Sequence, residues 1–381
     1  MKLLRRGILG LAGLAILALL VRTFVLRVYY VDSPSMEPYL HGAAEGGDRA
    51  LVVFGSGSEI KRGDVVVILP SGEDEPLVKR VLGLPGESVA LRNGDVWIDG
   101  EILRTDVDLA VPVLIFDSAH DDFEIAFRVP KAWLANGTGW TVEAANIEPD
   151  DLAGCSFMRL GLKDHYMDPT GKLIPGRDAV GDALLQCQLE MDQPGFVARL
   201  GLVERGDRFE LLIQSAPENQ ASVRLLRGVN ELYQGDVDWS PGPHRLRFGN
   251  VNNRLSFEMD GKRILTHDYA SNTNLPSDSL GLGRSPESDR VYLGGHSGVG
   301  RFSEVRVFRD LHYTPMGQFA VKESVPLGPT EIFLLGDNSR QSRDGREWGP
   351  TPLAEVIGRP VAVVWPPERM RNLDPAPLGQ L

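Results

Sequence analysis

Short runs in which apolar and polar residues alternate cover most of the chain and predict an all-β protein. A clear example is RLSFEM at 254–259. A period of two places every second side chain on the same face of a strand. Turn residues separate the runs, and Asn93-Gly94, Asp99-Gly100 and Asp260-Gly261 are strong signals for two-residue hairpins. We therefore expect antiparallel sheets with one buried and one solvated face.

The N-terminus breaks this pattern. Residues 7–21 read GILGLAGLAILALLV, without a polar side chain, after a basic start. Because Arg22 can reach the lipid headgroups, residues 7–26 can span a bilayer of about 30 Å. We expect an uncleaved transmembrane anchor with its N-terminus in the cytoplasm. A cleaved signal peptide is the alternative, although no small-x-small cleavage site follows the apolar core.

Length and composition limit the number of domains and exclude several classes of function. A chain of 381 residues is long for one domain and indicates two, or one domain with a large insertion. The formal net charge of −12 argues against a nucleic-acid partner, which requires a basic face. Only two cysteines are present, Cys155 and Cys187, too few for a disulfide framework, and whether they bond to each other stays open. The histidines lack metal-ligand spacing, so we expect no cofactor and no metal.

Candidate chemistry lies in two short segments. Ser33 and Ser35 follow a predicted strand at 28–31, and Lys79 and Arg80 interrupt an apolar strand. In a strand the last two point to opposite faces, so we expect one of them to point inward. A serine and an inward lysine suggest a Ser/Lys dyad, in which burial must lower the lysine pKa so that the neutral amine can act as a base. An ordinary Ser-Pro-Ser turn and a solvated edge-strand lysine are the alternatives.

Three sequence boxes identify a family resemblance. SPSMEPYL, KRVLGLPGE and GDNSRQSRDGREWG resemble, in order, the boxes of bacterial type I signal peptidases. GDRALVVF, RGDVVVI and NGDVWIDGEIL extend the match in the order of that family. The resemblance covers residues 10–105 and 316–367. Several separated motifs in one order are far more specific than any single motif.

The resemblance implies roles for the first segments. Ser35 corresponds to the acylating nucleophile and Lys79 to its general base. The hydroxyl of Ser33 joins the backbone N–H of Ser35 in the oxyanion hole, which typically supplies a few kcal/mol of transition-state stabilisation. Met36 corresponds to a packing residue beside the nucleophile, and Arg80 to a structural residue. Tyr39 replaces the threonine usual in the family.

The resemblance also implies roles at this site for residues of the closing box, GDNSRQSRDGREWG. Ser342 matches a hydroxyl that orients the lysine ammonium, and Asp344 and Arg346 match an acidic and basic pair that braces the site. Gly345 replaces the serine usual in the family. We interpret Asp337-Asn338 as turn-forming residues.

Residues 106–315 have an alternating pattern of their own and predict a two-sheet sandwich. The stretches at 241–265 and 301–310 resemble laminin-G/concanavalin-like jelly rolls. No Glu-x-Asp-x-x-Glu strand is present, so glycoside hydrolysis is not expected. A carbohydrate or a protein ligand remains open for this insertion. The aromatic residues that could stack on sugars, or that belong to the core, are Trp133, Trp140, Trp239 and Tyr233.

Together these features predict a single-pass serine endopeptidase of the bacterial cytoplasmic membrane, with its catalytic domain outside. It would remove signal peptides from secretory preproteins, and its partners would be those preproteins and membrane lipid; contact with the translocation machinery stays open. A tethered binding module on a degenerate scaffold and a self-cleaving Ser/Lys repressor protease are the alternative classes. The expected divisions are an anchor (1–27), a first catalytic part (28–105), the insertion (106–315) and a second catalytic part (316–381).

Overall fold

The structure is a computed structural model. It describes residues 26–55, 60–104, 113–137, 139–159, 161–169, 171–191, 194–270 and 290–373. The predicted anchor lies almost entirely outside these residues. Within the described ranges, no helix combines the length and the apolar character that crossing a membrane requires. The chain forms two compact units: unit 1 comprises residues 1–103, 168–170 and 312–381, and unit 2 comprises residues 104–167 and 171–311.

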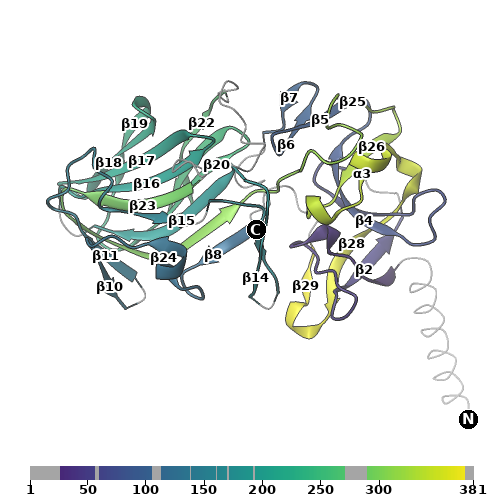
Figure 1. Ribbon diagram of the computed structural model, residues 1–381, viewed down its shortest axis with the longest axis horizontal. Coiled ribbons are helices and arrows are strands. Elements are labelled where there is room, and N and C mark those ends of the chain that lie inside the picture. Colours follow the sequence, from purple (N-terminus) through teal and green to yellow (C-terminus); the bar gives the residue numbers. More distant parts are fainter. Residues whose placement is uncertain are drawn as a thin grey trace, which may run out of the picture. The chain divides into compact units, whose positions relative to one another are not determined.

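Unit 1 is built from both ends of the chain (Figure 1). Its elements are β1 (Leu26–Tyr30), η1 (Pro34–Met36), β2 (Arg49–Phe54), β3 (Val65–Ile68), β4 (Leu77–Gly83), β5 (Ser88–Arg92), β6 (Asp95–Ile98), β7 (Glu101–Ile102), β25 (Val325–Pro326), β26 (Glu331–Leu335), η2 (Ser339–Gln341), α3 (Gly345–Trp348), β27 (Thr351–Pro352), η3 (Leu353–Glu355), β28 (Val356–Trp365), η4 (Pro367–Arg369) and β29 (Arg371–Asn372).

The main sheet of unit 1 joins strands that are far apart in the sequence. Its strand order is β1-β2-β28-β3-β4-β26-β27, with β29 paired to β28. The long β28 lies antiparallel to both β2 and β3, so the C-terminal part of the chain is inserted between N-terminal strands. Val66, Ile68, Val81, Ile332 and Leu334 form one buried cluster of this unit. Burying apolar side chains of this size contributes about 1.5–3 kcal/mol each, which makes the two chain ends one folded body.

A second sheet of unit 1 has the order β25-β5-β6-β7. The turns between its strands are the predicted Asn93-Gly94 and Asp99-Gly100 hairpins, which are confirmed. All four turn residues have positive φ, as two-residue turns of this kind require.

Unit 2 contains the elements from β8 to β24. They are β8 (Val113–Asp117), α2 (Phe123–Ala126), β9 (Phe127–Arg128), β10 (Trp133–Asn136), β11 (Gly139–Glu143), β12 (Cys155–Met158), β13 (Tyr166–Met167), β14 (Leu173–Ile174), β15 (Ala183–Glu190), β16 (Val197–Glu204), β17 (Asp207–Ala216), β18 (Gln220–Arg227), β19 (Asn230–Asp238), β20 (His244–Val251), β21 (Arg254–Met259), β22 (Lys262–Asp268), β23 (Arg290–His296) and β24 (Val299–Arg309).

Two large antiparallel sheets form the body of unit 2, and their strands lie in two layers (Figure 1). One has the order β10-β11-β24-β15-β20-β21-β22, with β8 paired to β24, and the other the order β19-β18-β17-β16-β23-β12-β9. Side chains connect the layers: the rings of Phe116 and Phe127 lie 5.2 Å apart, and Asn250 Nδ2 donates to Glu204 Oε2 at 2.8 Å. The all-β prediction is confirmed for the described residues.

One predicted strand of unit 2 begins as a helix instead. The alternating run DFEIAFRV predicts a strand throughout, but residues Phe123–Ala126 form α2 and only Phe127–Arg128 are extended. Asp122 accepts hydrogen bonds from the backbone N–H groups of Glu124 and Ile125. This N-cap satisfies donors that a helical turn leaves unpaired, and here it outweighs the alternating pattern.

The two cysteines lie on strands, and both are free and buried. Burial raises the pKa of the Cys155 and Cys187 thiols to about 12, because the apolar interior disfavours the thiolate. Neither thiol is therefore suited to nucleophilic chemistry at neutral pH.

Candidate active site

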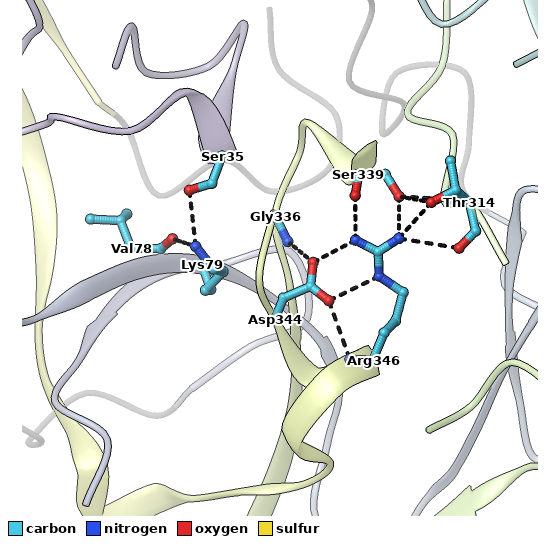
Figure 2. A network of polar contacts seen from close by, with 8 residues as sticks. All are labelled: Ser35, Val78, Lys79, Thr314, Gly336, Ser339, Asp344 and Arg346. Carbon is cyan, nitrogen blue, oxygen red and sulfur yellow. Dashed lines mark hydrogen bonds and ion pairs between the residues drawn. The ribbon is translucent and has the colours of Figure 1, made fainter. Parts of the chain in front are cut away.

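Ser35 and Lys79 come together at the start of unit 1. Ser35 lies in η1, a short turn that begins at Pro34, and Lys79 lies on β4, against which η1 packs. The Lys79 ammonium donates to Ser35 Oγ at 2.9 Å and to the carbonyl oxygen of Val78 at 2.9 Å (Figure 2). Ser35 is 6% exposed and Lys79 only 2%. A buried amine therefore contacts a buried hydroxyl at hydrogen-bond distance.

The surroundings favour the neutral amine. Burial lowers the pKa of Lys79 from 10.5 to about 8, since the site offers little water to solvate the charge. The carboxylates of Asp344 and Asp337 act in the opposite direction, and the Arg343 guanidinium adds to the lowering. At pH 8 about half of the lysine would be the neutral base that a serine nucleophile requires.

The other residues of the first box surround this pair. The Ser33 hydroxyl is exposed and donates to Ser35 Oγ at 3.3 Å. Met36 is 1% exposed and packs in a cluster with Val31, Leu40 and other apolar residues. Ser35 therefore lies between an exposed hydroxyl, that of Ser33, and a buried apolar side chain, that of Met36.

Both faces of β4 are buried, whereas the alternating pattern predicts that only one of Lys79 and Arg80 points inward. Arg80 has no exposed surface. Its Nε and Nη2 donate to the two carboxylate oxygens of Asp337 at 2.7 and 2.6 Å, and its guanidinium lies 5.0 Å from the centre of the Tyr39 ring. Although burial alone would lower the pKa of Arg80, the Asp337 carboxylate raises it above its usual value. Asp337 is therefore more than a turn residue: it neutralises a buried cation.

The turn after β26 closes the site. Asn338 N–H donates to the carbonyl oxygen of Ser35 at 3.0 Å. A Cβ on Gly336 would lie 2.5 Å from that carbonyl oxygen and 2.2 Å from Ser342 Oγ, so only glycine permits this approach. Gly336 N–H donates to Asp344 Oδ2 at 3.0 Å, which fixes the turn from the other side.

Asp344 and Arg346 form a buried two-point ion pair, as the resemblance implies. Arg346 Nε donates to Oδ1 and Nη2 to Oδ2 of Asp344, both at 2.9 Å, and neither residue is more than 2% exposed (Figure 2). The sequence did not indicate two further partners of Arg346. Ser339 Oγ and Thr314 Oγ1 accept from Arg346 Nη1 at 2.6 and 2.8 Å. The serine lies in the closing box, but a lone threonine at position 314 carries no sequence signal.

Ser342 and Gly345 also lie in the closing box, and both are tightly surrounded. Ser342 Oγ is buried and has no hydrogen-bond partner among the described residues, so the structure does not join it to Lys79. A Cβ on Gly345 would lie 2.8 Å from the carbonyl oxygen of Leu334. Close packing thus accounts for glycine at this position.

In unit 2, the aromatic residues are mostly part of the core. Trp133 and Trp239 are 4% and 5% exposed, so neither presents a ring on which a sugar could stack. Trp140 and Tyr233 are partly exposed. Across the described ranges, His, Cys, Asp and Glu side chains form no group of three that could hold a metal ion.

Comparison with known proteins finds similarity in the two segments of the chain that carry the Ser35 and Lys79 site. The family described as "Signal peptidase, peptidase S26" matches residues 4–112 and 296–365. Signal peptidase I of Bacillus amyloliquefaciens is 40% identical over 90 residues, which is 23% of this chain and 44% of that protein. Signal peptidase I of Leptolyngbya laminosa is 36% identical over 111 residues, or 26% of this chain and 53% of that protein. The chain thus spans about half the length of the curated relatives it matches.

Solved structures match over a different share of the chain. A native glycosidic hydrolase has a TM-score of 0.33 and 11% identity, covering 54% of this chain and 97% of its own. A Bacillus licheniformis β-glucanase has a TM-score of 0.30 and 9% identity, covering 55% and 95%. Likenesses of this size assign no activity. The two segments that carry the Ser35 and Lys79 site are thus similar to the signal peptidase family, peptidase S26.

Proposed function

We propose that the chain is a membrane-anchored serine endopeptidase that removes signal peptides from exported preproteins by a Ser/Lys dyad mechanism. The observation that carries this proposal is the 2.9 Å contact between the buried Lys79 amine and Ser35 Oγ. A serine hydroxyl becomes a competent nucleophile when a neighbouring base removes its proton, and a lysine can do so only when neutral. The lowered pKa of Lys79 makes that form accessible near pH 8.

In the proposed reaction, neutral Lys79 accepts the Ser35 proton while Oγ attacks the scissile carbonyl carbon. The oxyanion is stabilised by the Ser35 backbone N–H and the Ser33 hydroxyl. The ammonium then gives its proton to the leaving amine, and the acyl-enzyme forms. Lys79 next removes a proton from the water that attacks the ester, and it returns this proton to Ser35 Oγ as the acid product leaves.

The remaining residues would position these groups. The Asp344–Arg346 pair holds the turn at Gly336 against the nucleophile, as its hydrogen bonds indicate. Ser342, whose buried hydroxyl lies beside Gly336, would receive the Lys79 ammonium after proton transfer. Met36 would form part of the apolar floor beside Ser35.

The substrate would bind as an extended strand along β4. This strand pairs with β3 over Leu77–Ile68, Val78–Val67 and Lys79–Val66, whereas β26 pairs only at Arg80 and beyond. The backbone of Leu77–Lys79 therefore has a strand partner on one side within the described residues, and a peptide could pair with the other side. The apolar segment at residues 7–26 would hold this site at the membrane from which signal peptides emerge.

Processing of a preprotein in membranes that contain the full chain tests the proposal. Ser35→Ala and Lys79→Met should each lower the cleavage rate by roughly 10³-fold or more, since members of a catalytic unit fail together. Ser71→Ala and Lys61→Met change exposed residues of the same unit and should leave the rate unchanged. Normal cleavage by either dyad variant would refute the mechanism.

A further inference from the structure

The chain enters unit 1 again at His312, after it leaves unit 2, and runs through residues 312–320 without forming a helix or strand. We call these residues the return segment. It packs around Arg346: the backbone N–H groups of Gln318 and Phe319 both donate to the Arg346 carbonyl oxygen, at 2.7 and 2.9 Å. Thr314 of the same segment is 1% exposed and faces the guanidinium. The return segment thus contacts both the backbone and the side chain of Arg346.

Thr314 supplies two acceptors to this buried network. Arg346 Nη1 donates to the Thr314 carbonyl oxygen at 3.1 Å and to Oγ1 at 2.8 Å (Figure 2). Ser339 Oγ already accepts from Arg346 Nη1 at 2.6 Å and from the Thr314 N–H at 2.8 Å. Its own proton is therefore directed to Thr314 Oγ1, 3.2 Å away. Without that oxygen, a buried hydroxyl proton and a buried guanidinium would each lose an acceptor.

Two routes lead from this network to the backbone of Ser35. In the first, Arg346 holds Asp344, and Asp344 accepts from the N–H of Gly336, which lies against the Ser35 carbonyl. In the second, Ser339 directly follows Asn338, whose N–H donates to the same carbonyl oxygen. The two routes meet at one atom, the carbonyl oxygen of the residue that carries the nucleophile.

We propose that Thr314 is a positioning residue of the peptidase reaction. Its hydroxyl fixes Arg346 and Ser339, and through them it holds the turn from Gly336 to Ser339 against Ser35. The inference rests on the proposed roles of Ser35 and Lys79. By this inference, the first residues after unit 2 help to position the active site, in addition to connecting the insertion to unit 1.

The charges around Lys79 give this role a measurable consequence. The groups that act on its ammonium are Asp344, Asp337 and Arg343. Asp344 raises the pKa of Lys79, and Arg346 offsets the Asp344 charge through two hydrogen bonds. When Arg346 is held less firmly, Lys79 experiences more of the Asp344 charge. Its pKa should then rise, and the pH midpoint of activity should move upward.

Thr314→Val, Thr314→Ser and Thr351→Val in the full chain test the proposal. Thr351 is a matched control, because it is also a 1%-exposed threonine of unit 1, and its hydroxyl accepts from Trp348 on α3. We expect Thr314→Val to lower kcat about tenfold with KM changed less than twofold, and to raise the pH midpoint, since a hydrogen bond to a charged group is lost. Thr314→Ser keeps the hydroxyl and should restore both values. Thr351→Val should keep normal kcat even where its thermal stability falls.

The outcomes separate this inference from the proposed function. An unchanged kcat and pH profile in Thr314→Val would overturn it. So would equal losses in Thr314→Val and Thr351→Val at equal loss of stability, because that result indicates a structural role alone. If Ser35→Ala remains active in the same assay, the proposed function fails, whatever Thr314 does.

Discussion

Replacing Lys79 by methionine should make the protein inactive and more stable. The substitution keeps a flexible side chain of similar length and removes the buried charge. The fall in the Lys79 pKa from 10.5 to about 8 corresponds to about 3 kcal/mol, at roughly 1.4 kcal/mol for each tenfold change in proton affinity. Lys79 is almost fully buried, so solvent screening reduces this value little. It is the free energy that the folded state loses by holding a protonated amine in its interior.

The sign of the pH dependence follows from the two protonation states. Below about pH 8 the lysine is protonated in both the folded and the unfolded chain, and the full cost of burial applies. Between about pH 8 and 10.5 the unfolded chain binds more protons, so the stability of the wild type rises with pH. Lys79→Met has no such group. Its advantage should therefore be about 3 kcal/mol at pH 7 and should disappear near pH 10.5.

Hydrogen–deuterium exchange of β4 peptides in increasing urea measures this difference, because it follows the unfolding of unit 1 alone. In the wild type, kcat/KM should rise about tenfold from pH 7 to 9 and then level off, as the neutral fraction of Lys79 does. Ser35→Ala is the control: it removes activity but keeps the ammonium, so it should show no gain in stability at pH 7. A Lys79→Met protein no more stable than Ser35→Ala at pH 7, or an activity midpoint near pH 10, would refute the reasoning.

Two further predictions concern other buried groups. Asp337→Asn should destabilise unit 1 by about 3–5 kcal/mol, because it leaves the Arg80 charge buried without its partner. Arg80→Met combined with Asp337→Leu should recover most of that loss in the same exchange measurement. A small loss in Asp337→Asn would contradict the role given to the pair. Cys155 and Cys187 should not react with a thiol reagent at pH 7.5 until the chain is unfolded, since burial raises both thiol pKa values to about 12. Rapid labelling of the native protein would contradict their burial.

The fold class could be predicted from the sequence because its signals are local. Alternation along a strand and the Asn93-Gly94 and Asp260-Gly261 turns depend on neighbouring residues only, and the strands and hairpins at these positions agree with them. The helical turn at 123–126 was missed for a local reason too. Its pattern fits a strand, and a single capping carboxylate on Asp122 decides the conformation.

The partners within the site could not be predicted in the same way. Arg80 and Asp337 are separated by 257 positions, and neither residue type indicates the other. The sequence therefore predicts a structural arginine and a turn-forming aspartate, without the ion pair that joins them. Thr314 is a stronger case, because its role arises only when the chain after unit 2 folds against Arg346. Such contacts follow from the three-dimensional packing of distant segments.

The three buried cations of this site differ in one respect that bears on catalysis. Arg80 and Arg346 each donate two hydrogen bonds to a carboxylate, from Asp337 and Asp344. A guanidinium keeps its proton in proteins, so pairing it with a carboxylate is the way to bury its charge. Lys79 instead contacts a hydroxyl and a carbonyl oxygen, which stabilise the ammonium less than a carboxylate does. Losing the proton therefore requires less free energy at Lys79 than at either arginine, and in the proposed mechanism Lys79 is the base that activates the adjacent Ser35 hydroxyl. The arginine pairs fix the surrounding backbone, and the proposed proton transfer uses Lys79, which donates to a hydroxyl and a carbonyl oxygen in the described part of the chain.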